Sequence, residues 1–266
     1  MLAAAACFLG FVVVLVCAYA IAPVGRLDAI ALGGLMTLDG QPFYWLAVDA
    51  VHTADPLPVM VMLAGLFACG WVLGRRREAL AAVALVAGAN LTGLILQAAL
   101  AHPRFHPILG ADQVGPAAYP SGHATTAMSI ALAAVLVAPP RLRVAVAAGA
   151  AAYGIAVSIS LVVLGWHFPS AVLGGVLVSS GFFLLTVAAI RVSTAVRAGV
   201  AAHRDRLGLW LGLGGAGVAA AAAASLIARD ELVEFARLHT GATVTALAIM
   251  AVSAALVAST ALKSDH

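Results

Sequence analysis

The stretch ALAAVALVAGANLTGLILQAALA, residues Ala79–Ala101, contains no charged side chain. About 20 apolar residues in a helix cross the hydrocarbon core of a bilayer, so this stretch is long enough to span one. The rest of the chain has the same character: 64% of its 266 residues are hydrophobic, 9% are charged, and the mean hydropathy is +1.08. A soluble domain carries roughly 25% charged residues. We therefore predict an all-α integral membrane protein.

Eight apolar stretches of this kind follow one another along the chain. They are Ala4–Ile21, Pro58–Gly74, Ala79–Ala101, Ser121–Ala138, Val144–Leu164, Pro169–Ile190, Leu207–Ala228 and Gly241–Leu262. No Lys or Arg precedes the first stretch, so we expect a membrane span there and not a cleaved signal peptide. The segment Ala22–Leu57 between the first two spans holds Trp45 and several acidic residues, and is expected to lie partly at the membrane interface.

The basic residues are unevenly shared between the two sides of the predicted membrane. With the N-terminus in the cytoplasm, ten of the 14 Lys and Arg residues fall on the cytoplasmic side and four on the outer side. The ten are Arg75, Arg76, Arg77, Arg141, Arg143, Arg191, Arg197, Arg204, Arg206 and Lys263, and the four are Arg26, Arg104, Arg229 and Arg237. The positive-inside rule favours this orientation. We predict that the protein lies in the plasma membrane. No dense basic face is present, which argues against a nucleic-acid partner.

Polar side chains collect at three places, all on the predicted outer side. Gln97 and the segment HPRFH at residues 102–106 lie at the end of the third span. The segment PSGH at residues 120–123 opens the fourth span, and GWHFPS at residues 165–170 joins the fifth span to the sixth. Polar groups at membrane depth are costly and are usually functional. Because helix ends in a bundle can converge, these groups predict one shared pocket at the membrane surface.

The side chains in this predicted pocket suit phosphoryl transfer. Arg104 can hold a phosphate with a bidentate fork. Ser121 and Gly122 stand at a helix start, where free N–H groups and the helix dipole attract an anion. Of the two histidines His123 and His167, one can attack phosphorus while the other protonates the leaving oxygen. This scheme requires no metal and no cofactor.

Each element also has a purely structural interpretation. Ser121 can be an ordinary N-cap, His167 an interfacial histidine, and Arg104 an anchor among lipid headgroups. His102 and His106 can add positive charge or metal-binding capacity. A metal site is not expected, since Asp112 is the one nearby carboxylate that could support such ligands.

The motifs resemble those of the type 2 phosphatidic-acid phosphatase superfamily of membrane lipid phosphatases. That family carries Lys, six residues and Arg-Pro; then Pro-Ser-Gly-His; then Ser-Arg, five residues, His, three residues and Asp. The second motif is complete at residues 120–123, the third keeps its spacing in Ser160 and His167, and the first keeps Arg104. The resemblance implies a nucleophile at His167, an acid at His123, and lipid phosphates or isoprenyl phosphates as substrates.

The resemblance covers roughly Ala4 to Arg191 and also implies a domain organisation. Residues 1–191 are expected to form a six-span phosphatase-like core with its pocket on the outer face. Residues 192–266 are expected to form a C-terminal transmembrane hairpin. Small residues are abundant in the last two spans, which predicts close helix packing within the chain or with a membrane protein partner.

Several motif positions depart from the family pattern. Gln97 stands in place of Lys, Phe105 in place of Pro, Leu161 in place of Arg, and Ala171 in place of the Asp that orients the nucleophile. A donor aimed at the reacting group contributes on the order of 10²–10³ in rate. An orienting Asp in an unrelated triad contributes about 10⁴. The candidate substitutes are Gln97, His102, His106 and a backbone carbonyl.

Two functions therefore remain open at this point. The first is a lipid-phosphate phosphatase or phosphotransferase that works through a phosphohistidine. The second is a catalytically impaired relative that binds lipid phosphate or serves as a subunit of a membrane assembly. A channel or transporter is disfavoured, because Asn90 and Gln97 are the notable polar exceptions in otherwise apolar spans.

Overall fold

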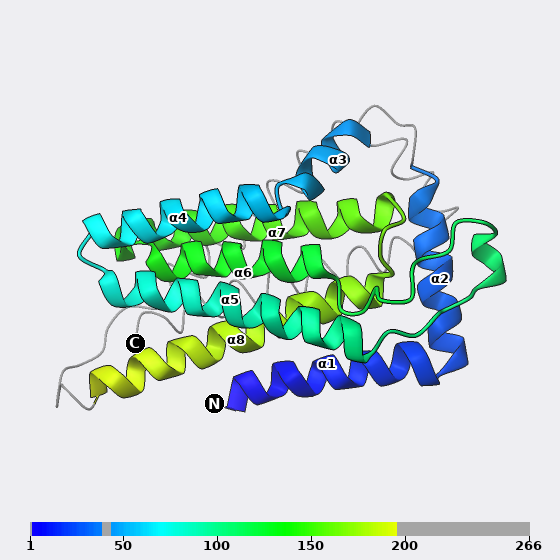
Figure 1. Ribbon diagram of the computed structural model, residues 1–266, viewed down its shortest axis with the longest axis horizontal. Coiled ribbons are helices and arrows are strands. Elements are labelled where there is room, and N and C mark those ends of the chain that lie inside the picture. Colours follow the sequence, from blue (N-terminus) through cyan, green and yellow to red (C-terminus); the bar gives the residue numbers. More distant parts are fainter. Residues whose placement is uncertain (1, 39–43, 196–266) are drawn as a thin grey trace.

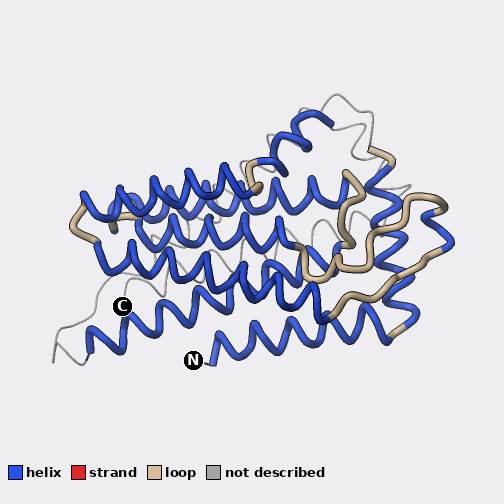
Figure 2. The backbone as a smooth tube through the Cα atoms, viewed as in Figure 1, coloured by secondary structure: helices blue, strands red, loops and turns tan. Residues whose placement is uncertain are grey.

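The computed structural model describes residues 2–38 and 44–195, and every regular element in these residues is a helix (Figures 1 and 2). The α-helices are α1 (Leu2–Ala20), α2 (Ala22–Met36), α3 (Tyr44–His52), α4 (Pro56–Val72), α5 (Arg76–Ala99), α6 (Gly122–Val137), α7 (Arg143–Val163) and α8 (Pro169–Ala195). Two 3₁₀ turns, η1 (Pro107–Leu109) and η2 (Pro140–Leu142), lie in the connections. The all-α prediction is confirmed for this part of the chain.

Six of the helices coincide within a few residues with the first six predicted spans. Within the described residues, α1, α5, α8 and α7 together with η2 are long and apolar enough to cross a membrane. The pair α3 and α4, bent by 61°, passes the same test as one unit, and α6 is a shorter apolar helix. The protein is therefore a multi-pass membrane protein. The predicted spans Leu207–Ala228 and Gly241–Leu262 lie outside the described residues.

Helix α6 occupies the centre of the bundle. It packs against α4, α5, α7 and α8, and Figure 1 shows these helices running side by side along the long axis. Small and apolar side chains cover all faces of α6, which is typical of a helix surrounded by other helices. Helix α2 stands across one end of the bundle in Figure 1. The motif that begins α6 is thereby held between the helices that surround it.

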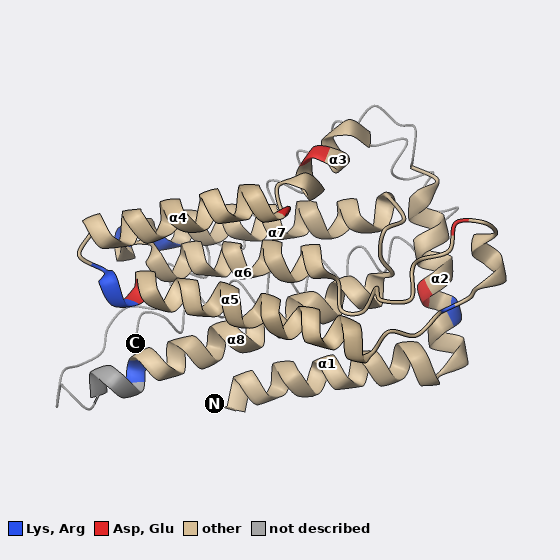
Figure 3. Ribbon diagram, viewed as in Figure 1, with Lys and Arg blue, Asp and Glu red and all other residues tan. Residues whose placement is uncertain are grey.

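Most of the Lys and Arg side chains in the described residues lie at one end of the bundle, near the start of α5 and the end of α8 (Figure 3). At this end, Arg75 donates to the carbonyl of Leu136 at 3.2 Å, and Arg143 donates to the carbonyl of Ala138 at 3.5 Å. Basic groups of this kind satisfy the free carbonyls and the negative dipole end at the C-terminus of α6. Asp28 lies at the opposite end, on α2. The separation agrees with the predicted asymmetry of the loops, and the cytoplasmic N-terminus stays a prediction.

Helix α8 lies so close to the start of α6 that the backbones of the two helices are in contact at Gly175. A Cβ atom on Gly175 would lie 2.7 Å from the Ser121 carbonyl oxygen and 2.9 Å from the Thr125 nitrogen, so only glycine fits at this position. The Ser121 N–H donates to the Ala171 carbonyl at 2.9 Å, which ties the two helix starts together. This contact brings the turn before α8 to the start of α6.

Candidate active site

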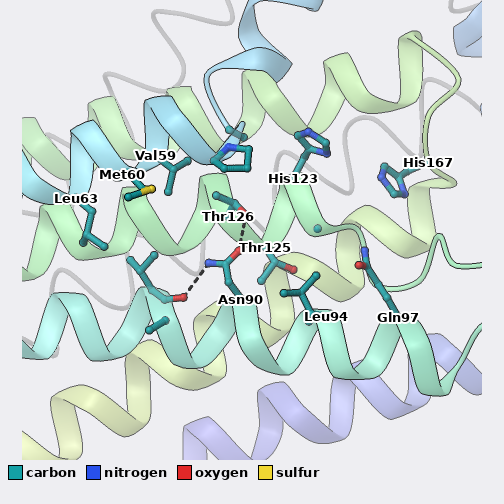
Figure 4. A pocket seen from close by; sticks show the side chains of 16 residues that line it. Val59, Met60, Leu63, Asn90, Leu94, Gln97, His123, Thr125, Thr126 and His167 are labelled. Carbon is teal, nitrogen blue, oxygen red and sulfur yellow. Dashed lines mark hydrogen bonds between the residues drawn. The ribbon is translucent and has the colours of Figure 1, made fainter.

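A cavity of about 610 Å³ lies between α4, α5 and α6 and reaches the turn between α7 and α8 (Figure 4). It is lined by Ala54, Pro56, Val59, Met60, Leu63, Val86, Ala87, Asn90, Gly93, Leu94, Gln97, Gly122, His123, Thr125, Thr126 and His167. Figure 4 shows the two histidines and Gln97 at one end, and Met60 and Leu63 at the other. Met60 on α4 is 67% exposed and Leu94 on α5 is 64% exposed. The cavity is thus a mainly apolar groove that opens sideways between α4 and α5.

The turn that presents His167 follows from two local signals in the sequence. Gly165 has a φ of +71°, and the N–H groups of Gly165 and Trp166 donate to the carbonyls of Val162 and Leu161, both at 3.0 Å. This glycine-dependent arrangement ends α7. Pro169 begins α8, since its fixed φ and missing N–H suit the first helical position. His167 is therefore held between two helix ends.

One ring nitrogen of His167 is fixed by the backbone. Its Nδ1 lies 3.0 Å from the carbonyl oxygen of Ala118. A carbonyl can only accept, so Nδ1 carries the proton and Nε2 keeps a free lone pair. Burial lowers the pKa of His167 to about 4, against the opposing effect of the Ala118 hydrogen bond, so the ring is neutral at pH 7. Position 171 is an alanine, so it offers no carboxylate to accept a hydrogen bond from His167. The Ala118 carbonyl is the acceptor instead.

His123 lies in the first turn of α6 and contacts a carboxylate that the sequence analysis did not assign to the site. Its Nε2 is 3.1 Å from Oδ1 of Asp55, whose Oδ2 is 2.7 Å from Nδ1 of His52. The hydrogen bond from His52 lowers the pKa of Asp55 most, burial opposes it, and the hydrogen bond from His123 lowers the pKa further, so Asp55 is ionised at neutral pH. Asp55 stands three residues before the predicted span Pro58–Gly74 in a chain with only 11 acidic residues, and this position is the signal in the sequence that could have identified it.

Ser121 and Gln97 have structural roles at the start of α6. Ser121 is fully buried, and its hydroxyl accepts from the Ala124 N–H at 3.3 Å, so Ser121 is the N-cap. Gln97 on α5 donates to the Pro120 carbonyl at 2.8 Å and lies beside Gly122. Gln97 and Gly122 both line the cavity, next to the histidines. Phosphate binding by Ser121 and Gly122 stays a prediction.

Arg104 is held elsewhere and does not line the cavity. Its Nη2 donates to Asp28 Oδ2 at 2.7 Å, and its Nη1 donates to Ser170 Oγ at 3.1 Å. Its guanidinium lies over the rings of Phe168 and Tyr19, with Cζ at 4.0 and 4.9 Å from the ring centroids. The side chains of Arg104 and Asp28 are each 7% exposed. Arg104 is thus one partner of a buried ion pair, and its predicted contact with phosphate stays a prediction.

The two remaining histidines of the predicted pocket also lie outside the cavity. His102 is exposed, with its ring 6.4 Å from that of Tyr19. The ring of His106 packs against Phe168 at 5.7 Å, and burial lowers the pKa of His106. Within the part of the chain that the structure describes, no three His, Cys or carboxylate side chains are grouped so as to hold a metal ion.

Asn90 is the polar exception deeper along the groove. Its amide nitrogen donates to the Val86 carbonyl at 2.8 Å and to Ser129 Oγ at 3.2 Å, and its oxygen accepts from Thr126. Both ends of the amide therefore have partners within the bundle. Asn90 joins α5 to α6 in the wall of the groove.

Comparison with known proteins gives two findings, one on the sequence and one on the fold. The family model of the PAP2 superfamily matches residues 78–195, which run from α5 through α8. No curated protein matches the chain. The fold is similar to the crystal structure of the first transmembrane PAP2 type phosphatidylglycerolphosphate phosphatase from Bacillus subtilis, with a TM-score of 0.57 and 22% identity over 72% of this chain and 97% of that chain. The match of residues 78–195 to the PAP2 family model and the similarity of the fold to a PAP2-type transmembrane structure together confirm the predicted resemblance.

Proposed function

We propose that this protein is a phosphatase or phosphotransferase that acts on a lipid or isoprenyl phosphate through a phosphohistidine at His167. One observation carries the proposal: His123 and His167 line one end of a cavity that continues as an apolar groove open between α4 and α5. A phosphate at the histidines would leave its hydrocarbon chain in the groove, in contact with Val59 and Leu63. The similarity to a phosphatase of the PAP2 type supports the same reaction class.

The proposed reaction has two displacements. In the first, the free Nε2 of His167 attacks phosphorus, the bond to the leaving oxygen breaks, and His123 gives that oxygen a proton. In the second, a water molecule attacks the phosphohistidine, His123 takes the proton from the water, and His167 is released. An alcohol in place of water would give transfer in place of hydrolysis. The hydrogen bond from Nδ1 to Ala118 holds the ring in the tautomer that the attack requires.

The phosphate would lie at the N-terminus of α6. The backbone N–H groups of the first helical turn and the positive end of the helix dipole favour an anion there. The amide of Gln97 lies beside the same turn. We assign this end of the bundle to the face outside the cytoplasm, as the distribution of basic residues predicts.

The first experiment measures phosphate release by the purified protein in detergent from a panel of lipid and isoprenyl phosphates. Release is expected from wild-type protein and is expected to disappear in His167→Ala. The exposed His102 supplies a matched control, and His102→Ala is expected to retain activity. Equal release by wild type and His167→Ala would exclude the phosphohistidine reaction.

A second candidate function is a catalytically impaired relative that binds lipid phosphate. It is favoured by the pairing of Arg104 with Asp28, and by the apolar side chains of Leu161 and Ala171, which are 0% and 1% exposed. No release across the panel, combined with a rise in melting temperature when the same lipids are added, would support binding without turnover. Release that depends on His167 would reject this candidate.

A further inference from the structure

Asp55 lies between two imidazole rings, in the turn whose Ala54 and Pro56 line the cavity. One carboxylate oxygen is 3.1 Å from Nε2 of His123, and the other is 2.7 Å from Nδ1 of His52. The indole of Trp166 packs edge-on against both rings, at 6.0 Å from His52 and 5.6 Å from His123. The three polar side chains thus form one chain of hydrogen bonds, with Trp166 in contact with its two ends.

The carboxylate is not used to cap the helix that it precedes. Asp55 is the N-cap of α4 by its backbone, with φ −68° and ψ 157°, and its side chain makes no capping hydrogen bond. An aspartate at this position commonly accepts from an N–H group of the first helical turn. Here both oxygens face imidazole rings. Its departure from the usual capping role is a second reason to connect Asp55 with His123.

The turn that carries Asp55 is anchored to a neighbouring helix. The hydroxyl of Thr53 lies 2.6 Å from the carbonyl of Ala50 and 3.0 Å from the hydroxyl of Tyr153 on α7. Tyr153 is only partly exposed and packs against both apolar clusters of the bundle. This hydrogen bond ties the turn that carries Asp55 to α7, which itself packs against α6.

We propose that Asp55 is the positioning residue for His123, and that His52 in turn orients Asp55. The inference rests on the proposed function, in which His123 serves as acid and then as base. With Nε2 bonded to Asp55, Nδ1 is the nitrogen left to exchange a proton with the leaving oxygen. The carboxylate stabilises the imidazolium in the first displacement, and its hydrogen bond keeps the ring in one orientation throughout.

The groups that face His123 come from three elements. They are His52 at the end of α3, Asp55 ahead of α4, and His167 in the turn between α7 and α8. Burial keeps His167 neutral near pH 7, so Asp55 is the anion in contact with His123. Asp55→Asn keeps the size of the side chain and removes its charge. Asp49→Asn is the matched control, because Asp49 is an exposed carboxylate on the neighbouring helix α3.

The test measures kcat from pH 5 to 9 for wild type, Asp55→Asn, Asp55→Glu and Asp49→Asn. For Asp55→Asn we expect kcat to fall by about 10²- to 10⁴-fold, the range for a mispositioned acid–base group. The alkaline limb of its profile should also move to lower pH. Asp55→Glu should recover part of the rate, and Asp49→Asn should match wild type. A rate loss with an unshifted profile would mark a purely structural role and overturn the proposal.

A second measurement separates this proposal from the proposed function. If wild-type protein neither releases phosphate nor transfers it to an added alcohol, the proposed function fails, but the contact itself can still be tested. The ¹⁵N resonances of the His123 ring, in protein labelled at histidine, are expected to move in Asp55→Asn and to stay in place in Asp49→Asn. Unchanged His123 resonances in folded Asp55→Asn would overturn the proposal whatever the activity of the wild type.

Discussion

Replacement of Asp28 by Ala is expected to destabilise the protein strongly, although this residue lies outside the cavity. Asp28 accepts from Arg104 Nη2 at 2.7 Å, from the Ser170 hydroxyl at 2.6 Å and from the Ser170 N–H at 3.0 Å. These bonds join α2, the segment after α5 and the first turn of α8. The replacement would leave the guanidinium of Arg104 buried without its anion.

The magnitude follows from the burial of the pair. Its two side chains are each 7% exposed, so water cannot replace the missing carboxylate without opening the structure. Removing one partner of a buried ion pair costs about 3–5 kcal/mol. For a protein of this size, about 2–4 °C of melting temperature corresponds to each kcal/mol, which predicts a decrease of about 6–20 °C.

The assay is thermal unfolding in detergent of Asp28→Ala, Arg104→Met and the double variant, with Asp49→Ala as the exposed control. The double variant should be less destabilised than the sum of the single variants, because it leaves no unpaired buried charge. A melting temperature for Asp28→Ala within about 2 °C of wild type would refute the reasoning, since it implies less than about 1 kcal/mol. Additive losses in the double variant would likewise show that the two side chains do not act as a pair.

Three further predictions concern the site. Gly175→Ala should lower the melting temperature, because its Cβ would lie 2.7 Å from the Ser121 carbonyl and overpacking costs about 1–3 kcal/mol; Gly149→Ala, with open space around its Cβ, is the control. Because the pKa of His167 is lowered from 6.5 to about 4, only the unfolded chain gains a proton between these values. The free energy of unfolding should therefore fall as the pH decreases through that window, by up to about 1.4 kcal/mol per pH unit. Urea unfolding at each pH measures this decrease, and the contribution should be absent in His167→Gln. Gln97→Lys adds a cation beside the start of α6 and should lower KM for a lipid phosphate, and an unchanged KM would place phosphate away from this position.

The helical core was predictable because a bilayer imposes a length and a composition on each span. Helices α1, α4, α5, α6, α7 and α8 match the predicted stretches within a few residues. The segment Ala22–Leu57 was less informative, since α2 and α3 are short and carry acidic residues within otherwise apolar sequence. Their structure depends on contacts with α7 and α8, which have no local pattern in the sequence.

The two cavity histidines were predictable as neighbours, because both stand at helix ends on the same side of the predicted membrane. Their hydrogen-bond partners were not. The Ala118 carbonyl is a backbone atom, which no side chain in the sequence announces. The Arg104–Asp28 pair joins residues 76 positions apart, so no helical spacing connects them. Tertiary packing determines these partners. A motif specifies only residue types and spacings, so it cannot predict them.

His123 and His167 have different hydrogen-bond partners, and this difference suits the different roles that we propose for them. In the family pattern the orienting carboxylate belongs to the nucleophilic histidine, whereas here a neutral carbonyl orients His167 and the carboxylate of Asp55 contacts His123. A carbonyl fixes a tautomer without adding charge, so burial can hold His167 neutral and ready to attack. A carboxylate favours a protonated partner, which is the state that an acid requires. The two histidines thus have different partners, a neutral carbonyl and a carboxylate, which is the division that the proposed reaction requires, and it does not depend on an Asp at position 171.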